Sequence, residues 1–395
     1  MTKILKFFFL LALGAAVGCS SKYPGVPEKY HALLDSALVK AGDHAPELKK
    51  ALEAVPASEK EGMAYLIAYM PEYDLKSIPA DLLIDNVHYA YIARNQYEWC
   101  KTLPDSVFLN EVLPYHNVTE NRDNWRKDFY DRFSPYVKDC KTLKEAVYAV
   151  NKNVRDELLV DYSTKRRASD QGPFESMESK MASCTGLTIL LNDAFRAVGI
   201  PARFAGTANW FDNRGNHSWN EVLIDGVWYF TEYYPEDLNK SWFAADAAKA
   251  TVGSANNGVF AVSYKPTGTL FPLVWDEAKP VNALEVTPRY LEVCAYAIKR
   301  DEKDSRVQLD LEAFTAAGYD AKSDNRIPVD ITVFCGDQQV GGGTTCNPTQ
   351  DLNNYLTFLV EPNQEYTIIS VYESLRKEEK VKVGSEDTRV RIVMK

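Results

Sequence analysis

Histidine and positive charge are both scarce in this chain. There are five histidines in 395 residues, and 45 Lys and Arg against 55 Asp and Glu give a formal net charge of −10. This acidic balance disfavours binding to nucleic acid and electrostatic adhesion to anionic lipid. The seven cysteines follow no spacing that is typical of a zinc site. The sequence implies no metal or organic cofactor, with calcium left open.

Long apolar runs are lacking too, except at the N-terminus. Lys3 and Lys6 precede an apolar run over 7–17, which is too short to span a bilayer and is typical of a signal peptide. Small residues then precede Cys19, as in a bacterial lipobox. We expect cleavage after residue 18 and lipidation of Cys19, which would anchor the protein to a membrane with its body outside the cytoplasm, on the periplasmic face or at the cell surface. The alternative is a plain secretory signal.

Cys184 stands at the expected start of a helix. Apolar residues recur at helical spacing after it: Leu187, Leu190, Leu191, Ala194 and Val198. Ser183 can cap the helix, and Gly199 with Pro201 ends it. Unpaired N–H groups and the positive end of the helix dipole favour a thiolate nucleophile in this first turn. The alternative is a buried structural cysteine, since free cysteine is among the most buried residue types.

A hairpin is expected after this helix. Residues 217–224 and 227–234 alternate in polarity, and Asp225-Gly226 between them is a two-residue turn signal. Such a turn pairs Ile224 with Val227, and every step outward pairs the next two residues. The register therefore brings the end of the second strand beside the start of the first.

His217, at the start of the hairpin, is the candidate base for Cys184. The other histidines all lie in the N-terminal third of the chain: His31, His44, His88 and His116. Glu232 becomes the diagonal neighbour of His217, about 7–8 Å away between backbones, so its carboxylate can orient the imidazole. Glu221, on the same strand, lies about 13 Å away and is too far. The alternative for His217 is a surface histidine that packs on Trp219.

The motifs around these residues resemble the transglutaminase-like superfamily over about residues 150–245. They are Cys184, Gly-Ile-Pro-Ala-Arg (199–203), His-x-Trp-x-Glu-Val (217–222) and Gly-x-Trp (226–228). The resemblance implies a papain-like core in which Cys184 is the nucleophile and His217 the base. The third catalytic residue of the family is usually an Asp late in the second strand. Here Glu232 holds that place, and Glu236 is a second candidate.

The resemblance also implies an oxyanion hole. One donor would be the backbone N–H of Cys184, and Gln171, in the loop before the helix, is a candidate for the second. The alternative for Gln171 is an ordinary polar loop residue. The basic cluster Lys165-Arg166-Arg167 nearby either binds an acidic group of a substrate or forms a solvated loop.

The flanking regions differ in their periodicity. Helical patterns precede the core, at 30–41, 46–55, 58–69, 125–133 and 143–159. Alternation of period two follows it, at 306–311, 329–335, 355–360, 366–371 and 388–394. We therefore expect an α+β protein with a helical N-terminal region over 19–149, a transglutaminase-like catalytic domain over 150–285 and a β-sandwich over 286–395. Gly341–Gly343 is expected to form a turn or a bulge.

Five cysteines remain after Cys19 and Cys184 are assigned. Disulfides are permitted outside the cytoplasm, and the candidate pairs are Cys335–Cys346 and Cys100–Cys140. An odd cysteine would remain, so we expect at least one buried free thiol.

These features predict a cell-envelope enzyme that forms a thioester at Cys184. Water as the acceptor gives amide hydrolysis, and an amine gives cross-linking. Bacterial proteins that resemble this one favour hydrolysis, so the expected partner is a peptide or protein substrate, with peptidoglycan as one option. The rival is a catalytically silent protein that keeps the fold to bind a partner, a glycan among the options, at the cell surface.

Overall fold

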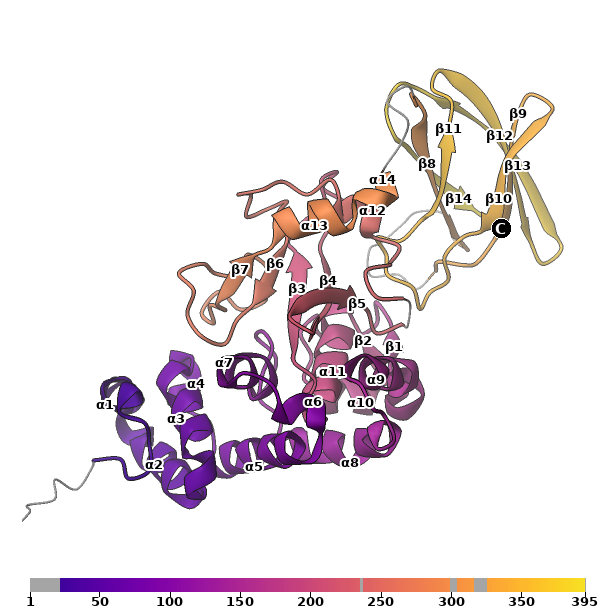
Figure 1. Ribbon diagram of the computed structural model, residues 1–395. Helices are drawn as coiled ribbons and strands as arrows, with labels where there is room; N and C mark the ends of the chain where they lie inside the picture. The colour runs from indigo at the N-terminus through magenta and orange to yellow at the C-terminus, as the bar shows by residue number, and fades with distance from the viewer. Residues whose placement is uncertain (1–21, 235–236, 299–303, 316–324, 395) are drawn as a thin grey trace, which may run out of the picture.

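The structure, a computed structural model, describes residues 22–234, 237–298, 304–315 and 325–394. Cys19, the expected signal peptide and Glu236 lie outside the described residues. Helices at the N-terminus, a central mixed core and C-terminal strands follow one another along the chain, which confirms the expected α+β class (Figure 1). No helix in the described part is both long and apolar enough to cross a membrane.

The N-terminal region is mainly helical, apart from its loops and the stretch over 113–125. Its elements are α1 (His31–Ala41), α2 (Ala45–Ala54), α3 (Lys60–Tyr69), α4 (Glu72–Leu75), α5 (Ala80–Gln96), α6 (Glu98–Lys101), α7 (Asp105–Val107), the π-turn η4 (Phe108–Val112), α8 (Arg126–Val137) and α9 (Leu143–Leu158). The helices expected at 30–41, 46–55, 58–69 and 143–159 are present, with ends shifted by two residues at most. Helix α9 begins at a capping box formed by Thr142 and Glu145, which fixes its first residue.

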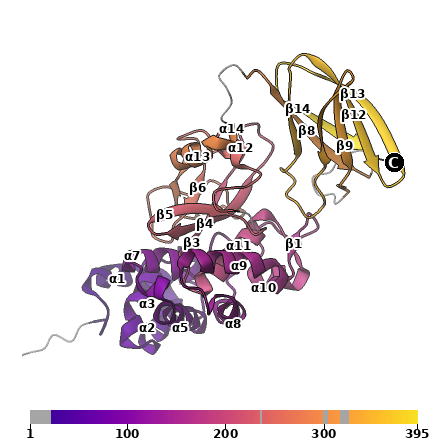
Figure 2. The same cartoon turned by 45° about the vertical axis from the view of Figure 1, so that its right-hand side comes forward.

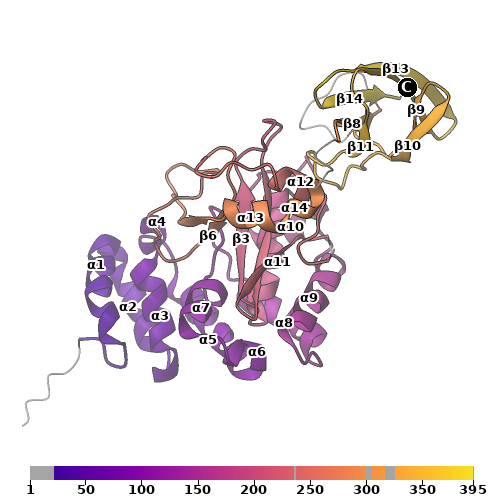
Figure 3. The ribbon, with the colours of Figure 1, turned by 45° about the horizontal axis from the view of Figure 1, so that its top comes forward.

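The central core is a five-stranded antiparallel sheet with the order β5-β4-β3-β6-β7. Its strands are β3 (Ala202–Thr207), β4 (His217–Ile224), β5 (Val227–Thr231), β6 (Phe260–Val262) and β7 (Ala283–Glu285). Helix α11 (Cys184–Ala197) packs between β3 and β4 on one side and α8 and α9 on the other (Figure 3). A short parallel pair, β1 (Asp161–Tyr162) and β2 (Met181–Ala182), and helix α10 (Pro173–Ser179) precede α11.

The core does not stop where the helical region was expected to end. One apolar cluster runs from Tyr23 to Tyr264 and includes side chains of α1, α5, α8, α9 and α11. Helix α12 (Ala244–Ala247) lies between β5 and β6 in the chain, and α13 (Thr287–Val293) and α14 (Ala295–Ile298) follow β7. Side chains of these helices share an apolar cluster with Trp219 of β4, whose ring Tyr290 of α13 contacts. Residues 287–298, expected in the sandwich, therefore lie against the central core.

The C-terminal strands form two sheets that share one apolar core. The first has the order β10-β9-β12-β13 and the second β11-β8-β14. The strands are β8 (Val307–Phe314), β9 (Asp330–Cys335), β10 (Gln338–Thr344), β11 (Leu356–Val360), β12 (Gln364–Tyr372), β13 (Leu375–Val383) and β14 (Thr388–Val393).

Two expectations for this region need correction. Gly341–Gly343 is not a turn but part of β10, although a bulge does occur between Gln339 and Gly341. The glycines leave room for the facing strand, since a Cβ at Gly341 would lie 2.5 Å from the ring of Phe358. Neither candidate disulfide is formed, because all six cysteines of the described residues are free thiols.

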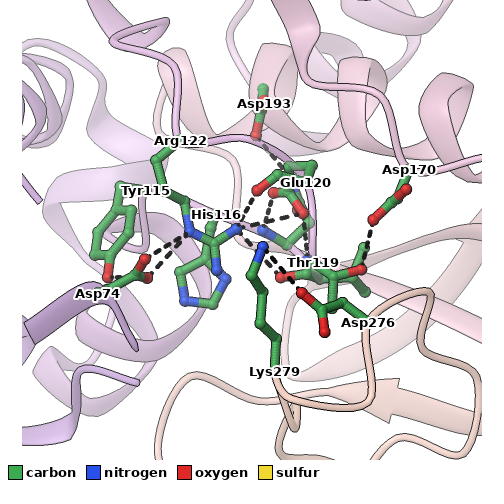
Figure 4. A network of polar contacts seen from close by, with 12 residues as sticks. Asp74, Tyr115, His116, Thr119, Glu120, Arg122, Asp170, Asp193, Asp276 and Lys279 are labelled. Carbon is green, nitrogen blue, oxygen red and sulfur yellow. Dashed lines mark hydrogen bonds and ion pairs between the residues drawn. The ribbon is translucent and has the colours of Figure 1, made fainter. Parts of the chain in front are cut away.

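Buried polar side chains join the helical region to the core (Figure 4). Arg122, in the loop before α8, donates from Nε to both carboxylate oxygens of Asp74 at 3.2 and 3.0 Å and from Nη1 to the carbonyl oxygen of Glu120 at 2.7 Å. The carboxylate of Glu120 accepts from the backbone N–H groups of Asn117 and Val118 at 2.5 and 2.7 Å. The Asn117 amide in turn donates to Asp193 of α11 at 2.9 Å. The loop is thereby fixed to the helix that carries Cys184.

We predict that Arg122→Met lowers the free energy of unfolding by about 3–5 kcal/mol, because it leaves the carboxylate of Asp74 buried without its cation. Urea denaturation measures this loss. The control is Arg132→Met on α8, whose half-exposed ion pairs with Asp128 and Glu157 should contribute only about 0–1 kcal/mol. Equal losses in the two variants would contradict the role given to Arg122.

Candidate active site

Cys184 is the first residue of α11, as the sequence predicts. The side chain of Ser183 caps the helix by accepting a hydrogen bond from the backbone N–H of Gly186 at 3.0 Å. Every residue from Thr185 to Ala197 is buried, whereas Cys184 itself is half-buried. A rigid, fully packed helix therefore presents one accessible thiol at its positive end.

His217 is the first residue of β4, and the hairpin has the expected register. Ile224 pairs with Val227, and the ladder continues to Asn220 opposite Thr231. Strand β3 runs along the other side of β4, where a Cβ at Gly206 would lie 2.6 Å from the carbonyl oxygen of His217. A glycine at this position thus allows the close approach of the two strands beside the imidazole.

Side chains tie β4 to the helix of the nucleophile. The hydroxyls of Thr185 and Ser218 lie 3.1 Å apart, and Asn220 donates to the carbonyl oxygen of Thr188 at 2.8 Å. Aromatic rings cover the imidazole, so that His217 is only 2% exposed: Trp210, Trp219, Trp242 and Phe243. The relative position of Cys184 and His217 is therefore fixed by packing and by hydrogen bonds.

Glu232, just after β5, holds the imidazole from one side. Its Oε1 lies 2.7 Å from Nε2 of His217, and its Oε2 accepts a hydrogen bond from Ser241. Asn151 of α9 fixes the backbone here by donating to the carbonyl oxygen of Glu232 at 2.7 Å. The longer carboxylate of Glu232 thus reaches the imidazole, as expected for the residue that stands where the resemblance implies an Asp. This contact leaves the other ring nitrogen, Nδ1, facing Cys184.

Asp351 is the residue that sequence reasoning missed. It lies in the loop before β11, so it belongs to the sandwich, whose lower loops reach toward β1 of the core (Figure 2). Its Oδ2 lies 3.4 Å from Nδ1 of His217, and ligand atoms of Cys184, His217 and Asp351 all lie within 4.8 Å of one another. Asn353 anchors the loop by donating to the carbonyl oxygen of Asn216 at 2.9 Å. No local pattern marks Asp351, because 134 residues separate it from His217.

Two carboxylates consequently face one imidazole. Burial alone would lower the pKa of His217, but the charge of Asp351 and hydrogen bonds with Asp351, Cys184 and Glu232 raise that pKa well above its ordinary value. Burial would raise the pKa of Asp351, yet the charge and hydrogen bond of His217 keep it below its ordinary value. Asp351 and His217 thus form a buried ion pair between the sandwich and the core.

Tyr162 of β1 is a second residue that the sequence did not single out. It pairs with Ala182, two residues before Cys184, and lines the same cavity. Burial, followed by the nearby Asp351 and Cys184, raises the pKa of its phenol well above the ordinary value, so the hydroxyl keeps its proton. In the described residues this oxygen accepts from the backbone N–H of Leu352 at 3.5 Å, which leaves its own proton to donate.

Gln171 lies just before α10 and makes hydrogen bonds to its neighbours in the chain. Its Nε2 donates to the carbonyl oxygen of Met181 at 3.0 Å and to the hydroxyl of Ser179 at 3.3 Å, and its Oε1 accepts from the backbone N–H of Arg167 at 2.9 Å. This arrangement favours the alternative of a polar loop residue, and the oxyanion role of Gln171 stays a prediction.

The other polar residues considered in the sequence analysis differ in their distance from the site. Glu221 is engaged far from the imidazole, where it accepts from Nε of Arg203 at 2.7 Å and from the hydroxyl of Tyr290 at 2.7 Å. In the basic cluster, Arg167 pairs with Glu175, whereas Arg166 lines a cavity of about 340 Å³ that also borders Cys184. Arg166 is thus the member of the cluster that lies near the nucleophile.

A cavity of about 410 Å³ opens beside Cys184 between the core and the sandwich. The core contributes Tyr162, Leu187, His217, Tyr233, Tyr234 and Trp242, among others, and the sandwich contributes Asn347, Thr349, Gln350, Asp351 and Asn354. Aromatic rings face amide and hydroxyl groups across it. Such a lining can hold an extended peptide by stacking and by hydrogen bonds.

The chain is similar to one family model and to several solved structures. Residues 131–247 match the family model described as the transglutaminase-like superfamily. No curated protein matches the chain. Three similar solved structures are a "putative cysteine protease" from Cytophaga hutchinsonii (18% identity, TM-score 0.28), a "putative protease" from Parabacteroides distasonis (10%, 0.23) and a red sea bream transglutaminase (10%, 0.32). The matches cover 48, 46 and 72% of this chain and 66, 30 and 65% of those chains, less than two thirds of each.

We predict that Asp351→Asn lowers the pKa of the His217 imidazole, because the variant removes the charge that most strongly favours its protonated form. Titration of the ring nitrogens by NMR measures the shift. Asp337→Asn, an exposed change in the same sandwich, is the matched control and should leave the titration of His217 unchanged. An unchanged curve in Asp351→Asn would contradict the ion pair.

Proposed function

Since residues 131–247 form a transglutaminase-like domain, we propose that the chain is a cysteine-dependent amide hydrolase acting on peptides or peptide-like substrates. One observation carries the proposal. The thiol of Cys184, at the start of a buried helix, lies within 4.8 Å of the imidazole of His217, whose far nitrogen is held by Glu232 at 2.7 Å. Nucleophile, base and orienting carboxylate are thus arranged in series.

The first half of the reaction makes a thioester. The thiol proton of Cys184 passes to Nδ1 of His217 as sulfur attacks the amide carbonyl carbon. Glu232 stabilises the imidazolium through Nε2. The backbone N–H of Cys184 and the hydroxyl of Tyr162 are our candidates for the two donors to the oxyanion, since Tyr162 and Cys184 line the same cavity. The amine leaves with the proton from His217 as the carbon–nitrogen bond breaks.

The second half resolves the thioester. His217 removes a proton from water, the resulting oxygen nucleophile attacks the carbonyl carbon, and the acid leaves as the thiol of Cys184 is restored. Hydrolysis is supported by the polar side of the cavity, where Asn347, Thr349 and Gln350 can hold water beside the acyl group. An amine in place of water would give transamidation, so release of acid and incorporation of amine must both be assayed.

The proposal extends to location and partner. Lipidation of Cys19 would attach the enzyme to the cell envelope, where peptides and the peptide stems of peptidoglycan are available as substrates. Release of a lipid-modified N-terminal peptide, identified by mass spectrometry of membrane fractions, tests the anchor separately from catalysis.

One observation favours the rival, a binding protein without activity. Asp351 faces the same ring nitrogen that must receive the thiol proton, at 3.4 Å, and so competes with Cys184 for it. A scaffold tolerates this competition, whereas an enzyme must overcome it when substrate enters. The two functions therefore differ in the reactivity of the thiol.

We predict that His217→Ala slows alkylation of Cys184 by iodoacetamide about tenfold or more near neutral pH, because the base that accepts the thiol proton is lost. Mass spectrometry follows labelling across pH, with half-buried Cys140 as an internal control that should not change. Equal rates at Cys184 in both proteins would favour the scaffold. Peptide and peptidoglycan-fragment libraries then test for released acid.

We also predict that Tyr162→Phe lowers kcat about 100-fold with little change in KM, since one oxyanion donor is lost. Turnover of a substrate found in those libraries measures it. Gln171→Ala is the comparison, and it should reduce thermal stability while leaving kcat of the folded protein nearly unchanged. The reverse pattern would return the oxyanion role to Gln171.

A further inference from the structure

We infer that Cys184, His217 and Asp351 form a binding site for a thiophilic divalent metal ion of the zinc class, and that the ion silences the thiol when it is bound. The thiolate, imidazole nitrogen and carboxylate oxygen are the ligand types that Zn²⁺ prefers. The three residues come from α11, β4 and the loop before β11, so no sequence spacing could show the set.

The distances suit a tetrahedral ion. Bonds of about 2.0–2.3 Å to N, O and S place neighbouring ligand atoms of a tetrahedral site about 3.3–3.7 Å apart. Nδ1 of His217 and Oδ2 of Asp351 already lie 3.4 Å apart, and the sulfur of Cys184 lies within 4.8 Å of them. A rotation of the half-buried Cys184 side chain closes the remaining gap. The fourth position faces the cavity and can hold water.

The position of the second ring nitrogen supports the same site. His217 is 2% exposed, and its Nδ1 lies 3.4 Å from Oδ2 of Asp351 and interacts with the thiol of Cys184. Glu232 accepts the proton of Nε2, so the lone pair that Nδ1 gains when it loses its proton is directed into the site. A carboxylate behind a histidine ligand is the usual arrangement in zinc sites, where it orients the ring and makes it a better donor.

Charge supports the same conclusion. Asp351 and Glu232 contribute two negative charges around one imidazole, and a thiolate would add a third. A divalent ion exactly offsets the charges of the Cys184 thiolate and the Asp351 carboxylate, while Glu232 keeps the proton of Nε2. Binding forms a metal–sulfur and a metal–nitrogen bond and releases the protons of the Cys184 thiol and of His217 Nδ1 to solvent, so neither oxidant nor reductant is needed. The bound thiolate is no longer available to attack a carbonyl.

The test uses the metal-free full chain and needs no substrate, so its result is independent of the proposed hydrolase activity. Co²⁺ is added as a spectroscopic probe, and Zn²⁺ affinity is then measured by competition with a chelating dye. We expect a thiolate-to-cobalt absorption band in the near ultraviolet that Cys184→Ser abolishes. Asp351→Asn, which keeps the shape of the side chain, should weaken Zn²⁺ binding about tenfold or more. Bound Zn²⁺ should also protect Cys184 from iodoacetamide.

Asp337→Asn and Cys140→Ser are the matched controls, and both should bind as the unchanged protein does. X-ray absorption of the zinc-loaded unchanged protein avoids variants altogether and should show one sulfur among the ligands. The absence of a cobalt–thiolate band, a zinc shell without sulfur, or equal Zn²⁺ affinity in Asp351→Asn would each overturn the site.

Discussion

The complete burial of helix α11 is the constraint on which the rest of the structure depends. Its side chains from Thr185 to Ala197 are all enclosed, polar ones included, so each polar group needs a partner from outside the helix. Asn117 supplies the amide for Asp193, and Arg196 donates to the carbonyl oxygens of Glu111 and His116. These partners come from the segment between α7 and α8. The helical region is therefore not an attachment to the core, because it satisfies and encloses the helix that carries the nucleophile.

Because α11 holds Cys184 in a fixed place, the reactivity of its thiol depends on the groups around His217. Glu232 and Asp351 approach opposite nitrogens of one ring, and they have opposite consequences. The contact at Nε2 sets the tautomer that a base for Cys184 requires. The contact at Nδ1 stabilises the protonated ring before any thiol proton has been transferred. A substrate that displaces the Asp351 loop, or weakens this ion pair, would restore the basicity of the imidazole where it is needed.

Local sequence rules predicted the parts of the site that local geometry determines. The turn at Asp225-Gly226 fixed the register of the hairpin, and Ser183 with the apolar period after it fixed the start of α11. Sequence analysis did not identify Asp351 and Tyr162, because their positions depend on how the sandwich and β1 pack on the core. The periodicity of the sequence does not predict that packing. The prediction of a turn at Gly341–Gly343 was wrong for a related reason. The small size of these glycines leaves room for the facing side chains of Phe358 and Leu356, whereas sequence alone suggests a turn or a bulge, and only the bulge is present.

The C-terminal sandwich contributes residues to the candidate site of the core. Its loop lines the cavity beside Cys184 and places a carboxylate within reach of both the sulfur and the imidazole. The proposed acyl transfer and the proposed metal binding would use the same lone pair on Nδ1, so they would exclude one another at any moment. Both would also depend on the position of Asp351, which lies in a loop of the sandwich. A change in how the sandwich docks would therefore alter the reactivity of the thiol without any change in α11 or in the hairpin, and the two domains would act as one catalytic unit.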